Sequence, residues 1–315
     1  MSTPIARAAI LALAGLLVRC TAETARISDR YCAANLLSGA DGNDELRIFP
    51  SDGKIVTKTL PSQFGRVVFG QDGQTIYRVN SRELRSRLPG GPGLSKLELN
   101  PLRFTPMPQT TGFAINTFAI SRNQDKLLIS GNRFDGNVTV CGLFDVSLAS
   151  GLVREVLRSN CHGSWGWEDI SFSPDGEHAI AVARSRNSPH RDLEMIDLVH
   201  GTAKAFLAHF EIAAWSPDGR WIAAIRNHHL SVMEGHNVSK RRDMGRAWMM
   251  PEWSPDSRYL LLWQHPLRCG IGIDVDPPAT LAALDMQSGE TYTIRSSQCR
   301  LVQGVTGWVS SELLK

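Results

Sequence analysis

Phe172-Ser173-Pro174-Asp175-Gly176 decides the fold, because the same pattern recurs as Trp215-Ser216-Pro217-Asp218-Gly219 and Trp253-Ser254-Pro255-Asp256-Ser257. Proline presets the backbone for the second position of a turn, aspartate hydrogen-bonds its own backbone, and glycine accepts a positive φ. Each copy therefore predicts a tight turn between two strands. Recurrence of one such unit predicts a repeat architecture.

Weaker copies of the turn extend the repeat along the chain. The six aromatic or apolar anchors that precede a turn are Phe69, Ile120, Phe172, Trp215, Trp253 and Trp308. Neighbouring anchors are 38 to 55 residues apart, which is enough for four strands and their turns. Strand-like runs follow the strong turns at 178–183, 221–225 and 259–263. Each unit is therefore predicted to be a four-stranded meander.

The two ends of the chain are predicted to share one unit. Three strand-like runs, near 31–37, 45–49 and 55–60, precede Phe69, and a single run surrounds Trp308. Three strands and one strand complete a blade, and their pairing removes exposed sheet edges. The sequence thus predicts an all-β protein: a six-bladed β-propeller of four-stranded antiparallel blades, closed by pairing the N-terminal strands with the C-terminal strand.

Composition agrees with one all-β domain in this chain of 315 residues. A hydrophobic content of 42%, with 27 glycines and 16 prolines, suits many short strands joined by turns. The formal net charge of +3 gives no electrostatic case for nucleic-acid binding. We expect a single propeller domain over residues 23–315 and a monomer.

Residues 1–22 have the pattern of a cleaved export signal. Arg7 supplies a positive start, 8–18 is an apolar run too short to span a bilayer, and Cys20-Thr21-Ala22 offers small residues for a signal peptidase. We therefore expect a periplasmic or secreted protein whose mature chain has no transmembrane segment. Lipid attachment at Cys20 is a less favoured alternative, because Arg19 replaces the small residue that usually precedes a lipidated cysteine.

The aromatic-Ser-Pro-Asp-Gly repeats resemble those of TolB-type propellers, a family of exported bacterial proteins whose units are often called WD-repeat-like. The resemblance covers nearly the whole mature chain and rests on residues that build turns and packing. It implies an exported protein that binds other proteins or envelope components through a propeller surface.

Five cysteines remain after the expected cleavage, and an exported protein meets an oxidising environment. Cys161 and Cys299 each follow a hairpin glycine by ten residues, whereas Cys141 and Cys269 each precede a predicted third strand. The natural disulfides are therefore Cys141 with Cys161 and Cys269 with Cys299, which leaves Cys32 over. Five buried thiols without bonds are the alternative.

Candidate binding residues lie just before the predicted innermost strands, because propeller topology gathers those segments at one mouth of the central channel. They are Arg66, Asn116, Trp165, Trp167, Glu168, Asp169, Glu211, Trp248 and Glu252. Carboxylates there could hold a cation or a basic peptide, and exposed tryptophan is common where binding energy concentrates. The structural alternative is that the tryptophans pad loops between blades and the carboxylates are solvated.

Two functions follow from these residues. The first is a non-catalytic exported propeller that binds a protein or envelope partner through this mouth; the sequence contains no local motif for catalysis, a metal or a cofactor. The second is a metal-assisted, lactonase-like hydrolase. Its divalent ion would be held in the channel by four carboxylates, those of Glu168, Asp169, Glu211 and Glu252.

Overall fold

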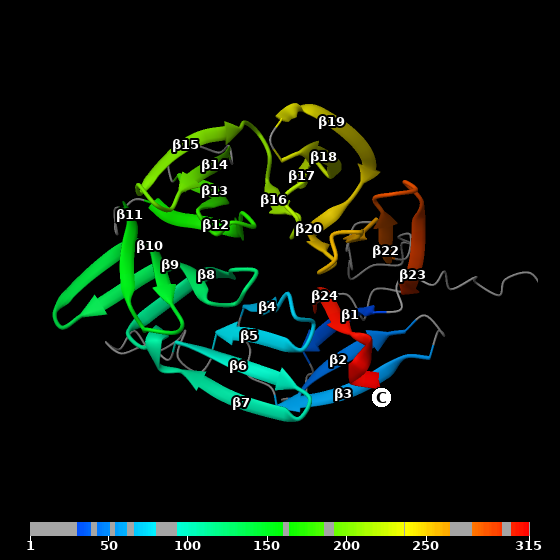
Figure 1. Ribbon diagram of the computed structural model, residues 1–315, viewed down its shortest axis with the longest axis horizontal. Helices are drawn as coiled ribbons and strands as arrows, with labels where there is room; N and C mark the ends of the chain where they lie inside the picture. Colours follow the sequence, from blue (N-terminus) through cyan, green and yellow to red (C-terminus); the bar gives the residue numbers. More distant parts are fainter. Residues whose placement is uncertain are drawn as a thin grey trace, which may run out of the picture.

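The computed structural model describes residues 30–38, 43–50, 54–61, 66–79, 93–159, 164–185, 192–235, 237–264, 279–297 and 304–314 (Figure 1). These residues form six four-stranded antiparallel sheets arranged as the blades of a propeller. The prediction of an all-β, six-bladed propeller is therefore confirmed. Among the described residues, no helix is long and apolar enough to cross a bilayer.

Each blade is a meander whose first strand lies nearest the centre (Figure 1). Blade 2 contains β4 (Val67–Phe69), β5 (Thr75–Val79), β6 (Leu94–Leu99) and β7 (Leu102–Met107). Blade 3 contains β8 (Phe113–Ile120), β9 (Lys126–Asp135), β10 (Val138–Ser147) and β11 (Val153–Ser159). Blade 4 contains β12 (Ser164–Phe172), β13 (His178–Ser185), β14 (Asp192–Asp197) and β15 (Thr202–Leu207).

The remaining blades follow the same plan, and the first combines both ends of the chain. Blade 5 contains β16 (Ile212–Trp215), β17 (Trp221–Arg226), β18 (His229–Glu234) and β19 (Asn237–Arg246). Blade 6 contains β20 (Trp248–Trp253), β21 (Tyr259–Trp263), β22 (Ala279–Asp285) and β23 (Thr291–Ser297). Blade 1 contains β24 (Gly304–Ser310), β1 (Tyr31–Ser38), β2 (Asn43–Phe49) and β3 (Val56–Pro61).

The C-terminal strand occupies the innermost position of blade 1. It pairs antiparallel with β1 from Tyr31 opposite Ser310 to Leu37 opposite Gly304. It also contacts the inner strands β4 and β20 of the two neighbouring blades. Among the described residues, two short 3-10 helices, η2 (Pro108–Thr110) and η4 (Ser311–Leu314), lie outside the sheets.

Buried side chains gather in the seams between blades. The middle of β13 and all of β21 are buried, because a neighbouring blade covers each face of these sheets. In the seam between blades 5 and 6, the indole of Trp253 donates a hydrogen bond to the Ala214 carbonyl at 3.0 Å. The same repeat position in blade 1 is Trp308, whose indole donates to the Glu252 carbonyl at 3.0 Å. These anchor tryptophans therefore tie adjacent inner strands together.

The Ser-Pro-Asp-Gly motif closes the turn between first and second strands through its side chains. The Ser173 hydroxyl accepts from the His178 amide at 2.9 Å, and Asp175 accepts from the Glu177 amide at 2.9 Å. Gly176 has a φ of +70°, which explains why glycine recurs there. The serines of the other copies make the same contact with the amide five residues on.

Of the three strong copies of the turn, one has a serine where the other two have glycine. Ser257 adopts a φ of +62°, a conformation that is costly for a residue with a side chain. Its hydroxyl accepts a hydrogen bond from the Asp218 amide at 2.9 Å, in the corresponding turn of blade 5. The substitution therefore adds a link between two neighbouring turns.

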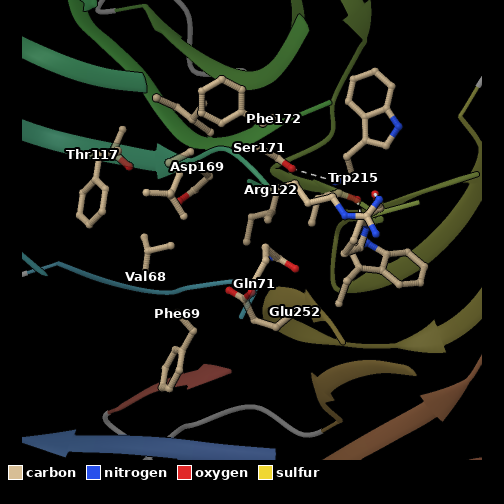
Figure 2. A pocket seen from close by; sticks show the side chains of 18 of the residues that line it. Val68, Phe69, Gln71, Thr117, Arg122, Asp169, Ser171, Phe172, Trp215 and Glu252 are labelled. Atoms are coloured by element: carbon tan, nitrogen blue, oxygen red, sulfur yellow. Dashed lines mark hydrogen bonds between the residues drawn. The ribbon is translucent and has the colours of Figure 1, made fainter. Parts of the chain in front are cut away.

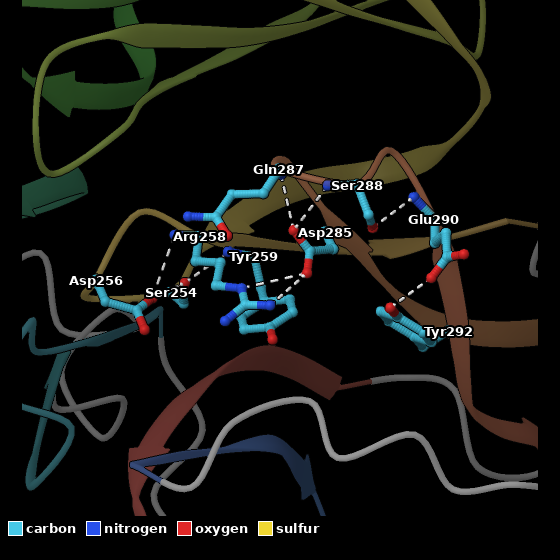
Figure 3. A network of polar contacts seen from close by, with 9 residues as sticks. All are labelled: Ser254, Asp256, Arg258, Tyr259, Asp285, Gln287, Ser288, Glu290 and Tyr292. Carbon is cyan, nitrogen blue, oxygen red and sulfur yellow. Dashed lines mark hydrogen bonds and ion pairs between the residues drawn. The ribbon is translucent and has the colours of Figure 1, made fainter.

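A polar network at one end of blade 6 fixes the turn between its third and fourth strands (Figure 3). The Asp285 side chain is buried and accepts hydrogen bonds from the Gln287 amide at 2.7 Å and from Arg258 Nη2 at 2.9 Å. Burial raises the pKa of Asp285, but these hydrogen bonds outweigh it, so the pKa lies below its ordinary value.

Asp285→Asn should destabilise the protein at neutral pH by roughly 2 kcal/mol, because a buried charge-assisted contact is lost. A carboxyl group with a depressed pKa stabilises the fold above the unfolded-state pKa of about 4, and this contribution disappears as the pH falls through the folded-state value. Urea unfolding should therefore show a large difference between variant and parent at pH 7 and a small one at pH 3. Equal unfolding midpoints at pH 7 would contradict the assigned role.

Candidate functional site

A cavity of about 630 Å³ lies where the inner strands of the six blades meet (Figure 2). Residues of β4, β8, β12, β16, β20 and β24, or of the turns beside them, line it. Most of the lining is apolar. The polar exceptions on which the site depends are Arg66, Gln71, Thr117, Arg122, Asp169 and Glu252.

The inner strands begin earlier than the sequence analysis assumed. Asn116 lies inside β8, Trp167 and Asp169 lie inside β12, and Glu252 lies inside β20, so these residues do not precede their strands. Of the nine candidates, only Arg66 and Glu211 precede an inner strand. A residue within an inner strand can line the channel itself.

Irregular pairing in the inner strands coincides with the residues that line the cavity. The register of β8 shifts around Asn116, that of β12 shifts between Glu168 and Ser171, and that of β20 shifts between Trp248 and Glu252. Bulges redirect side chains and are common beside functional sites. They also explain the longer strands, since the extra residues interrupt the apolar pattern from which strand boundaries were predicted.

Asp169 sits in the β12 irregularity with a φ of +45°. This backbone conformation is uncommon for a residue other than glycine, and strain of this kind is frequent at functional sites. The Asp169 carboxylate forms an ion pair with the guanidinium of Arg66, just before β4. Arg66 and Asp169 belong to blades 2 and 4, so the pair reaches past blade 3. We call this end of the channel the strand-start mouth, defined by Arg66 and Asp169.

An arginine also crosses the opposite end of the inner strands. Arg122, in the turn between β8 and β9, donates a hydrogen bond to the Pro217 carbonyl at 2.8 Å, in the turn between β16 and β17. This contact joins blade 3 to blade 5 past blade 4. We call this end the turn mouth, defined by Arg122 and Pro217.

Glu252 extends into the cavity from β20 (Figure 2). Glu252 is partly exposed as a whole residue, but its carboxyl group is enclosed by the cavity wall. Burial raises the pKa of this carboxyl group to about 8. Within the described part of the chain, its carboxylate has no hydrogen bond or ion pair. Glu252 is therefore predominantly neutral at pH 7.

The tryptophans of the predicted surface are packed. The Trp167 indole donates to Glu194 at 2.8 Å and the ring packs in the seam between blades 3 and 4. Trp248 is half-buried and stacks on His228, with ring centroids 5.2 Å apart. The side chain of Trp165 lies outside the described residues.

The four carboxylates of the proposed metal site do not all meet. Asp169 and Glu252 line the cavity, whereas Glu168 and Glu211 do not. In the described ranges, no three side chains of histidine, cysteine, aspartate or glutamate lie close enough to hold one metal ion.

Gln71, Thr117 and Arg122 line the cavity but were missed by the sequence analysis. The sequence does distinguish two of these residues, because Gln71 and Arg122 occupy the turn position at which the strong copies of the repeat have proline. Pro174, at the same position, also faces the cavity. A polar residue at the proline position of the repeat therefore indicates a side chain that faces the channel. Thr117 had no such signal.

The predicted disulfides stay predictions. Cys141 is buried inside β10, not before it, while Cys161, Cys269 and Cys299 lie outside the described residues. Cys32 is buried in β1. The expected export signal, residues 1–22, is also outside the described ranges.

Replacing Glu252 by glutamine should stabilise the protein at alkaline pH. A raised carboxyl pKa means that ionisation favours the unfolded state between pH 4.5 and about 8, so Glu252 costs increasing stability across this interval. We expect Glu252→Gln to raise the free energy of unfolding by roughly 1–3 kcal/mol at pH 8 and by little at pH 4. Chemical denaturation at both pH values measures this, with exposed Glu177→Gln as control. A gain that is equal at both pH values would contradict a buried, neutral Glu252.

Comparison with solved structures finds this fold in proteins of low sequence identity. One chain of a nidogen/laminin complex matches with a TM-score of 0.58 at 9% identity, over 89% of this chain and 98% of that chain. A TolB-like protein from Agrobacterium tumefaciens gives a TM-score of 0.53 at 14% identity, over 90% and 99% of the two chains. The tricorn protease gives 0.50 at 10% identity, over 87% of this chain and 30% of that chain.

No family model matches the chain, and no curated protein matches its sequence. At these identities the structural likeness establishes the fold alone. The protein is thus a six-bladed propeller that has a TolB-like protein among its structural neighbours.

Proposed function

We propose that the protein is an exported, non-catalytic propeller that binds a protein or cell-envelope component through the strand-start mouth. The observation that carries this proposal is the ion pair of Arg66 and Asp169 at that mouth, built on a strained position of β12. The Arg66 side chain is 37% exposed and that of Asp169 is 19% exposed, so a partner can reach both charges.

Rigid surroundings support a binding role for this mouth. Trp167 is held by its hydrogen bond to Glu194, and Trp248 by its stack on His228. Preorganised aromatic side chains lose little entropy when a partner covers them. They form the described aromatic part of the proposed surface; Trp165, whose side chain lies outside the described residues, is the third tryptophan that the sequence predicts for it. Export rests on the sequence pattern of residues 1–22 and on the resemblance to TolB-type propellers.

Charge reversal at the mouth tests the proposal. The immobilised mature chain should capture a partner from an envelope extract of the source cells, and Arg66→Glu should reduce that capture at least tenfold, because it places two carboxylates together. Arg103→Glu, an equivalent change on the exposed edge of blade 2, should capture as the parent does. Mass spectrometry of the eluates gives the comparison. Equal capture by all three proteins would exclude the strand-start mouth.

A metal-assisted hydrolase is the second candidate, favoured by one observation. Asp169 and Glu252 line the same cavity, and a carboxyl group with a pKa of about 8 has the properties of a general acid. Elemental analysis of protein purified without chelators separates the two candidates. We expect substoichiometric metal, whereas one Ca²⁺ or Zn²⁺ per chain would favour the hydrolase and count against the binding protein.

A further inference from the structure

Three basic side chains form a row across blade 5, at the end where β16 begins. The strands β17, β18 and β19 lie side by side in this blade (Figure 1). Arg226 of β17 is directly opposite His229 of β18, which is in turn opposite Arg246 of β19. Residues directly opposite each other in antiparallel strands point to the same face of the sheet. The two arginines therefore flank the imidazole on one face, and all three residues are exposed. We call them the basic row.

The backbone fixes the basic row in place. Asn227 and His228 both have a positive φ, of +50° and +62°, as in a two-residue hairpin turn. The Ala247 amide donates a hydrogen bond to the His228 carbonyl at 3.0 Å, which ties the end of β19 to this turn. The His228 ring also stacks on Trp248. The three strand ends that carry the row are therefore held together without a ligand.

The charges of the two arginines are not neutralised by the protein. Within the described part of the chain, neither the Arg226 nor the Arg246 guanidinium has a hydrogen bond or an ion pair. The Asp243 carboxylate lies 3.8 Å from Nδ1 of His229, but its side chain is 68% exposed. Glu211, just before β16, forms no ion pair in the described ranges. Like charges opposite each other destabilise a sheet, so an anion that neutralises them is favoured.

Protection of a sheet edge is the structural alternative. Charged side chains on an edge strand prevent it from pairing with another sheet, and the edge strand β19 has four basic residues against one acidic residue. This alternative does not account for Arg226, because β17 is paired on both sides. An unpaired cation on an interior strand, in register with another on the edge, indicates a site for an anion.

We propose that the basic row binds the phosphoryl group of a phosphate monoester. Each guanidinium can donate two parallel hydrogen bonds to phosphate oxygens, and a phosphoryl dianion has enough acceptors and charge for two arginines. A carboxylate or a sulfate ester has a single charge, which one guanidinium matches. Neighbouring strands are only about 5 Å apart, so both long side chains can reach a group placed over His229. This site is separate from the ion pair of the strand-start mouth and does not depend on partner binding there.

A ³¹P NMR titration of phenyl phosphate with the whole mature chain tests the inference at physiological ionic strength. We expect a saturable shift with one site per chain. Arg226→Gln and Arg246→Gln should each weaken binding by about tenfold or more, because each removes one guanidinium from the site. Arg242→Gln is the matched control: it removes the same charge from the opposite face of β19, where Arg242 lies over Trp221. Its affinity should equal that of the parent within about twofold.

Further arms define the ligand. Phenyl sulfate has the same ring with a single charge and should compete about tenfold more weakly than phenyl phosphate. Sedimentation with vesicles that contain phosphatidic acid distinguishes the source of the phosphoryl group. A parent protein that sediments while Arg226→Gln does not indicates a lipid headgroup, and a parent that stays in solution indicates a soluble ester.

Three results would each overturn the site. They are the absence of a saturable shift with phenyl phosphate, equal binding by the parent and both arginine variants, and equal affinity for phenyl sulfate. Circular dichroism confirms that every variant is folded. Because the titration contains no partner protein, its outcome is independent of the capture experiment at the strand-start mouth.

Discussion

Packing of each blade against its two neighbours is the interaction on which the rest of this structure depends. A four-stranded meander alone would leave both faces exposed, yet strands such as β21 are buried along their whole length. In the seam between blades 6 and 1, Trp308 of β24 packs with Trp263 and Tyr259 of β21, so residues from both ends of the blade order share one cluster. The seams between the other blades contain equivalent clusters. Removal of one blade would therefore expose two apolar faces.

Since the blades are held together at their seams, the inner strands are available to form a functional site. Because stability comes from the seams, the inner strands tolerate irregular pairing, and β8, β12 and β20 all contain register shifts beside the cavity. Asp169 can adopt a positive φ, and Glu252 can remain buried without a partner among the described residues, since the surrounding packing offsets both costs. The two arginine contacts, from Arg66 and Arg122, connect blades that are not neighbours.

The partly exposed ion pair and the enclosed carboxyl group are different parts of this centre. The strand-start mouth presents an ion pair that a macromolecule can reach, whereas Glu252 lies within the channel. The packed state of Trp167 and Trp248 gives them a structural role whatever they bind, because each already has a partner inside the protein. Of the two carboxylates that line the cavity, that of Asp169 is already paired with an arginine, whereas that of Glu252 has no partner among the described residues.

The sequence by itself determined the architecture, because a repeat is a local signal: Ser-Pro-Asp-Gly fixes turns, and its spacing counted six units. It also placed the C-terminal strand, since a single strand after the last unit had to complete the first blade. Only the tertiary structure decided the site. The ion pair of Arg66 and Asp169 spans 103 positions of sequence, and the elevated pKa of Glu252 arises from walls contributed by several blades. Such contacts depend on bulges and on the direction of side chains across the axis, which no local pattern specifies.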